Sequence, residues 1–190
     1  MRKAKIFTLA LIALSSMSIL SCGSSGGGNQ GNTVYITAAS KSGSTFTIST
    51  TAISSNGPPI VYNTGSLDFT ISSKLYPNTT GTFASTVEIT QAQISYTPLM
   101  ASDGLTMSPA IATWSKGVGP TLVAPGSTAD ITLTVVDVPQ MVALSKEAAF
   151  NSTIQFRYGL HVRFIGTETN SNTSLVCDVT NNNFYVTKGP

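Results

Sequence analysis

The chain has 190 residues, of which only 9% are charged, and Arg2, Lys3 and Lys5 supply three of its ten basic residues. Residues 22–190 contain seven basic and eight acidic residues, so this part of the chain has a formal net charge of −1. A near-neutral domain argues against binding to nucleic acid or to anionic lipid. Serine, threonine, asparagine and glycine supply the polarity instead, and these residues favour strands and turns over helices.

Residues 1–21 have the pattern of a secretory signal peptide. Three basic residues precede an uncharged apolar run over residues 6–20, which is too short for a stable membrane span. The run ends in two aliphatic residues and a small one, Ile19, Leu20 and Ser21, directly before Cys22. This segment resembles the lipobox of bacterial lipoproteins. The resemblance implies cleavage before Cys22, lipid on its thiol and anchoring in the membrane of the cell envelope.

The residues after the cysteine refine this expectation. In Gram-negative lipoproteins an aspartate at the position of Gly23 marks inner-membrane retention, so the resemblance implies an outer-membrane location. Residues 24–32, SSGGGNQGN, are too small and polar to bury a core and are expected to form a flexible tether. A random coil of roughly 10 residues spans about 18 Å. The domain is therefore expected to stay close to its membrane.

Residues 33–190 are expected to form one domain, large enough for a core without disulfides. Alternating apolar residues and turn signals predict seven to nine strands, with no alternation of strands and helices. The expected strands are 33–39, 45–53, 66–73, 82–97, 110–114, 129–137, 153–166 and 174–187. A helical turn near 140–149 is the single helix-like segment in the domain.

The stretch 153–166, TIQFRYGLHVRFIG, shows the longest clean alternation in the chain. Successive side chains of a strand point to opposite faces. The apolar set that includes Phe156, Tyr158 and Leu160 is therefore expected to face the core. Arg157 and Arg163, the arginines outside the leader, are expected to face outward. This stretch is predicted to be a central strand.

Two strands show faults in their alternation. In 82–97 the apolar parity changes between Ile89 and Ala92, which predicts a β-bulge near Gln91 or a crossing between sheets. Residues 181–183, three asparagines, predict a second bulge in the last strand. Residues 116–128 contain several glycines and prolines and are predicted to be a loop.

The whole pattern predicts an all-β fold, an antiparallel sandwich of two sheets. From residue 33 to 187 it resembles bacterial immunoglobulin-like and fibronectin-III-like domains, in which a helical turn links strands E and F. Tyr158 is near the position of the tyrosine corner in those domains, although its spacing to the helical turn does not match closely. A jelly roll or an open barrel is the alternative.

No residue pattern indicates catalysis, so the protein is expected not to be an enzyme. His161 is the only histidine, and the chain contains neither a GxSxG turn nor a phosphate loop. Cys177 has no partner for a disulfide if Cys22 carries lipid. It shares one strand face with Leu175 and Val179 and is therefore expected to be buried in the core. No cofactor or metal is expected. The alternative is a weak calcium site in the polar loop 167–173, which begins near Glu168.

The candidate binding residues are Asp103, Trp114 and Lys116. Trp114 is expected to pack in the core, and the alternative is an exposed ring that stacks on sugars. The loops 98–109 and 116–128 are expected to meet at one end or edge of the sandwich and to bind an envelope protein or a glycan. The alternative for the first loop is a core cap, plugged by Met100, Leu105 and Met107. The expected function is partner binding by a lipid-anchored domain, with a carbohydrate-binding module as the alternative.

Overall fold

The computed structural model describes residues 33–41, 64–77, 84–147, 149 and 153–188, together with the backbone of 46–50. The predicted signal peptide, Cys22 and the tether lie outside these residues. The described part is built from β1 (Val34–Ser40), β2 (Phe46–Thr50), β3 (Gly65–Leu75), β4 (Val87–Leu99), β5 (Trp114–Val123), β6 (Thr128–Val136), α1 (Val138–Ser145), β7 (Phe156–Glu168) and β8 (Ser174–Lys188).

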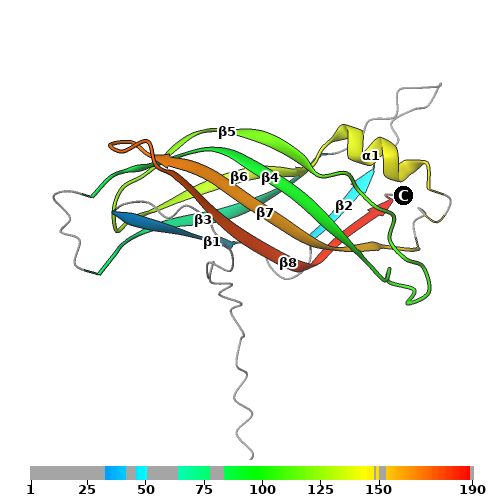
Figure 1. Cartoon of the computed structure of the whole chain (residues 1–190). Helices are drawn as coiled ribbons and strands as arrows, with labels where there is room; N and C mark the ends of the chain where they lie inside the picture. Colours follow the sequence, from blue (N-terminus) through cyan, green and yellow to red (C-terminus); the bar gives the residue numbers. More distant parts are fainter. Residues whose placement is uncertain are drawn as a thin grey trace, which may run out of the picture.

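The strands form two sheets that pack face to face (Figure 1). One sheet has the order β1-β3-β6 and the other has the order β2-β8-β7-β4-β5. In immunoglobulin lettering these orders are A-B-E and, from β8 to β5, G-F-C-C′. The predicted all-β sandwich is confirmed. One detail differs from the antiparallel prediction, because β2 pairs with β8 in parallel. β2 lies at the edge of the second sheet and runs in the same direction as β1.

The centre of the larger sheet is β7, as its alternation predicts. It pairs with β4 on one side and β8 on the other. Phe156, Tyr158 and Leu160 are buried, whereas Arg163 is exposed, so the two faces are as predicted. Across the sandwich, the rings of Phe69 and Phe164 lie 5.3 Å apart in an edge-on arrangement, which joins the two sheets.

Both predicted bulges are present. The register of β4 shifts between Ile89 and Gln91 against both of its neighbours. In β8 the shift lies between the partners of Tyr158 and Leu160, where the chain carries its asparagines. Each bulge restores the inward parity of the residues that follow it. Cys177 is buried on β8, as expected.

The predictions of a loop over 116–128 and of a strand over 110–114 are both wrong. Residues Trp114–Val123 form β5, and the turn to β6 covers only the residues after it. Glycine and proline suggested a loop, but β5 is the outermost strand of its sheet, where a missing N–H or side chain is tolerated. Opposite Thr90, three residues of β5 bulge out of the ladder.

The predicted helical turn is present as α1, a little earlier than 140–149. It begins after Asp137, whose side chain accepts a hydrogen bond from the N–H of Val138. Gln140 completes a capping box by accepting from the N–H of Asp137. Pro139 therefore lies in the first turn of the helix, where its missing N–H costs nothing.

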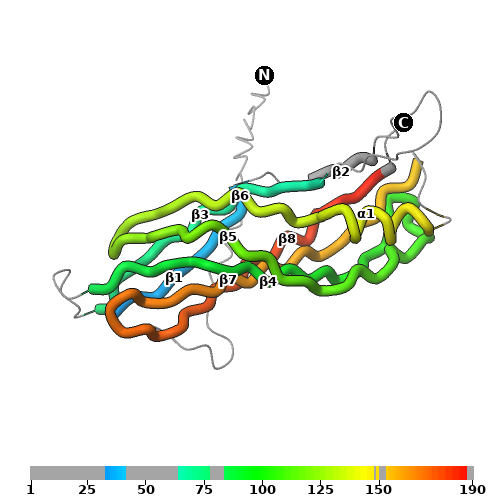
Figure 2. The backbone as a smooth tube through the Cα atoms, turned by 90° about the horizontal axis from the view of Figure 1, so that it is seen from above, coloured from blue at the N-terminus to red at the C-terminus, as the bar shows by residue number. Residues whose placement is uncertain are grey.

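The sandwich has two distinct ends, because its strands run along the long axis of the molecule (Figure 2). At one end the chain enters β1, and Val87 pairs with Glu168. At the other end Leu99 pairs with Arg157, and both α1 and the β4–β5 loop lie at this end. The length of β4 separates these ends by about 40 Å. The loop 98–109 and the β5–β6 turn therefore lie at opposite ends, and the prediction that they meet is wrong.

Candidate functional site

Two of the three predicted site residues lie together. Trp114 and Lys116 point to the same side of β5, and the Lys116 ammonium lies 5.9 Å from the centre of the indole ring. Asp103 lies in the loop between β4 and β5. No described contact joins Asp103 to the other two, so the structure divides the predicted site into an edge cluster and a loop.

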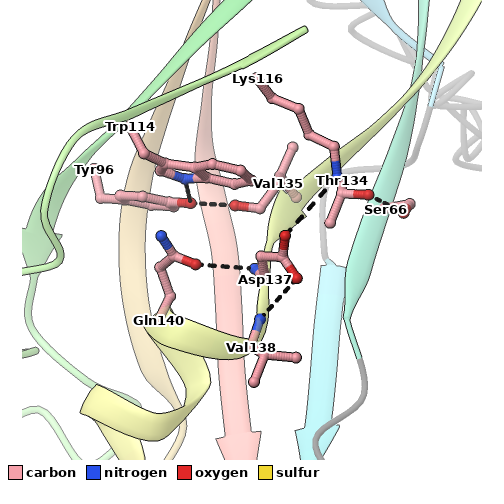
Figure 3. A network of polar contacts seen from close by, with 9 residues as sticks. All are labelled: Ser66, Tyr96, Trp114, Lys116, Thr134, Val135, Asp137, Val138 and Gln140. Atoms are coloured by element: carbon pink, nitrogen blue, oxygen red, sulfur yellow. Dashed lines mark hydrogen bonds and ion pairs between the residues drawn. The ribbon is translucent and has the colours of Figure 1, made fainter. Parts of the chain in front are cut away.

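The edge cluster is a polar network between the two sheets (Figure 3). The indole Nε1 of Trp114 donates to the hydroxyl of Tyr96 over 3.0 Å, and that hydroxyl donates to the carbonyl oxygen of Val135. Burial raises the pKa of Tyr96 far above its usual value, with the hydrogen bond from Trp114 acting in the opposite direction. Tyr96 therefore stays protonated and joins β4 to β6 through a neutral hydrogen bond.

Lys116 extends this network to the start of α1. Its ammonium lies 3.9 Å from the carboxylate of Asp137, the residue that caps the helix. Trp114 itself is half-buried against the core, and Lys116 lies over its ring. The cluster holds β5, β6 and α1 together. The indole N–H is therefore already hydrogen-bonded, and the indole ring already contacts a cation, so neither is free to bind a sugar.

Asp103 shapes its own loop. One carboxylate oxygen accepts from the N–H groups of Leu105 and Thr106, both at 3.0 Å, and the other accepts from the Thr106 hydroxyl at 2.6 Å. The hydroxyl contact, followed by the N–H contacts, lowers the pKa of Asp103. Its hydrogen-bonding capacity is directed at the loop, and this loop geometry is an Asx turn.

The β4–β5 loop carries exposed apolar side chains that we call the apolar tip: Met100, Leu105 and Met107. Their exposed fractions are 42%, 86% and 59%. The alternative in which they plug the core is therefore wrong. Neighbouring residues on the same loop, Ala101 and Ser108, are buried instead.

The loop that presents the tip is held by many hydrogen bonds. Met100 and Met107 form a β-bridge, and the N–H of Ala101 donates to the carbonyl of Thr106 over 2.8 Å. The N–H of Ser102 donates to the carbonyl of Gln155 over 3.0 Å, which fixes the loop to the approach of β7. A loop ordered in this way holds its exposed side chains in one arrangement. Such an arrangement lowers the entropy lost when a partner binds.

Glu168 has a role that the sequence reasoning did not find. It is fully buried, and its Oε1 accepts from the N–H and hydroxyl of Thr33 and from the N–H of Val34, at 3.0, 3.0 and 3.2 Å. Its Oε2 accepts from the Ser171 hydroxyl at 2.6 Å. The carboxylate in the predicted calcium loop thus binds protein donors and holds the start of β1.

The remaining candidates for chemistry are separated. His161 is exposed on β7, and its Nδ1 lies 3.0 Å from the hydroxyl of Thr180. Within the described residues, no three histidine, cysteine or acidic side chains lie close enough to hold a metal. No helix in the same residues is long and apolar enough to cross a membrane.

The chain matches no family model, and no curated protein or solved structure is significantly similar to it. The apolar tip is exposed, whereas the edge cluster and Glu168 are engaged in contacts within the protein.

Proposed function

We propose that this protein is a non-enzymatic, lipid-anchored component of the bacterial cell envelope whose sandwich binds a protein partner through the apolar tip. The observation that carries the proposal is the exposure of Met100, Leu105 and Met107 on an ordered loop. Exposed apolar groups gathered on a rigid loop are typical of a binding surface, whereas single scattered ones need no explanation.

The position of the tip fits a tethered protein. The chain enters the sandwich at Thr33, which Glu168 holds at the end remote from the β4–β5 loop. A lipid on Cys22 and a tether of about 18 Å would keep the entry end near the membrane. The tip would then face away from the bilayer by about the length of β4, in reach of another envelope protein. The proposed location is the outer membrane, on the resemblance of the leader.

Site-specific photo-crosslinking tests the proposal in the full chain expressed in bacteria. A photoreactive amino acid at Leu105 should give a discrete crosslinked product in the membrane fraction. The same amino acid at Leu122 is the matched control, because Leu122 is also an exposed leucine, at 62%, but lies near the other end of β5. Equal products from both positions, or none from Leu105, would contradict binding through the tip.

Glycan binding through Trp114 is the other candidate, and the geometry favours it less. The indole N–H is bonded to Tyr96, and Lys116 lies over the ring. Recognition of a sugar by stacking needs a free aromatic face. A titration with cell-envelope oligosaccharides, followed by tryptophan fluorescence, would revive this candidate if the emission changed in a saturable way.

A further inference from the structure

The two arginines of β7 differ in their partners. Arg163 forms a two-pronged ion pair with Asp178, with its Nε and Nη2 at 2.7 and 3.1 Å from the carboxylate oxygens. Arg157 lies six residues away on the same face of the strand, and it forms no ion pair with any acid in the described part of the chain. It is therefore a fixed cation whose charge no acidic side chain of the described residues neutralises in an ion pair.

Hydrogen bonds and a ring hold Arg157 in place. Its Nε donates to the carbonyl of Asn182 over 3.3 Å, and its Nη2 donates to the side chain of Asn183 over 2.9 Å. Its guanidinium lies 5.9 Å from the centre of the Tyr185 ring. The asparagines belong to the β8 bulge, a feature that often redirects side chains. Among the described residues these are the hydrogen bonds of the guanidinium, and they leave Nη1 and one hydrogen of Nη2 available to a ligand.

Arg157 also lines an open hollow of about 470 Å³ beside the apolar tip. Its walls are Met100, Ala101, Ser102, Gln155, Arg157 and Tyr185. Met100 belongs to both the hollow and the tip, so the two features form one continuous surface. None of the described residues that line the hollow is acidic, and the guanidinium is the charged group among them.

We propose that this hollow binds an acidic side chain of a partner peptide, whose neighbouring aliphatic residues pack on the apolar tip. The proposal rests on the proposed function and names the chemistry of the partner. A guanidinium with planar donors recognises a carboxylate strongly, and more so where it is already ordered. Met100 and Leu105 are apolar and not aromatic, so they complement leucine-like side chains, whereas sugars prefer aromatic surfaces.

The test uses the full-length protein in lipid nanodiscs and measures peptide binding by NMR or calorimetry. The probes are the peptides acetyl-Leu-Glu-Leu-amide and acetyl-Leu-Gln-Leu-amide, together with trigalacturonate as an acidic sugar. The glutamate peptide should bind at least about tenfold more tightly than its glutamine counterpart, the effect of a charged hydrogen-bonded pair. This comparison needs no mutation and does not depend on the folding of a variant.

Arg157→Gln should lower the affinity for the glutamate peptide by about tenfold. Arg163→Gln, the matched control, should lower this affinity by less than about twofold. Equal affinity for the two peptides, equal effects of the two variants or no measurable binding would overturn the proposal. Tighter binding of trigalacturonate would overturn the assignment to a peptide. If crosslinking from Leu105 persists while the peptides fail to discriminate, only this inference fails. If crosslinking fails while discrimination persists, the proposed function fails instead.

Discussion

The indole N–H of Trp114 donates a 3.0 Å hydrogen bond to the hydroxyl of Tyr96, and that hydroxyl is itself bonded to the backbone of Val135. The contact joins the edge strand β5 to β4 and, through Val135, to the opposite sheet. One phenol therefore serves as acceptor and donor at the open edge of the sandwich. Neither partner is free to act on a ligand without breaking this link.

Tyr96→Phe should lower the free energy of unfolding by about 1–3 kcal/mol, because it leaves the Trp114 N–H and the Val135 carbonyl without this partner. Urea denaturation measures the loss. Tyr158→Phe is the matched control, since the buried hydroxyl of Tyr158 has no hydrogen-bond partner among the described residues. Its removal should leave stability unchanged or raise it. An equal loss of unfolding free energy in Tyr158→Phe would contradict the stabilising role of the Tyr96 hydroxyl.

The buried carboxylate of Glu168 should stabilise the sandwich at the end where the chain enters β1. Glu168→Gln places an amide among N–H and O–H donors, and we expect a loss of roughly 2–3 kcal/mol. Hydrogen exchange at Val34 should accelerate because the start of β1 is released. Glu88→Gln is the control, since Glu88 is half-exposed on β4. Similar stabilities for the two variants would show that Glu168 does not hold β1.

The two faces of β7 should differ in their response to truncation. Phe156 is 1% exposed, and Phe156→Ala should cost about 3–5 kcal/mol through the cavity that it leaves. Arg163→Ala should cost less than about 1 kcal/mol, because its ion pair with Asp178 is exposed. Thermal denaturation of the two variants is sufficient. Comparable losses would contradict the assignment of the faces.

The Asx turn predicts a pH dependence confined to the β4–β5 loop. The hydrogen bonds from Thr106 and Leu105 lower the pKa of Asp103 in the folded state, so their stabilisation is present above the unfolded pKa. It is lost as the pH falls through the folded value. An NMR titration of the Asp103 carboxyl carbon should therefore show a midpoint below 3.8, the ordinary value. A midpoint at or above that value would mean that the turn does not form in solution.

The proposed anchor has its own test. Cys22→Ala should move the full-length protein to the soluble fraction or leave an uncleaved precursor, since the lipid on this residue is the proposed attachment. Fractionation followed by mass spectrometry of the amino terminus distinguishes the two results. A processed variant that stays in the membrane fraction would overturn the lipobox interpretation.

The sandwich was predictable because β7 and the bulges of β4 and β8 leave clear signals in the alternation. The same alternation could have placed Glu168 inside, since it shares the inward parity of Phe156 and Tyr158. β5 was missed because glycine and proline are read as loop signals, and sequence alone does not show that a strand lies at an edge. The pairing of Arg163 and the open hollow at Arg157 depend on cross-strand register, which the chain order does not reveal.

The central claim is that the apolar tip binds a partner, and a double substitution tests it most directly. Leu105→Ser with Met107→Ser removes most of the exposed apolar surface without touching the buried Ala101 or Ser108. Recovery of the partner from membranes treated with a general chemical crosslinker should fall by at least about tenfold, while the melting temperature stays within about 2 °C of the parent. Leu122→Ser should leave recovery unchanged. Undiminished recovery with the double variant would contradict the claim.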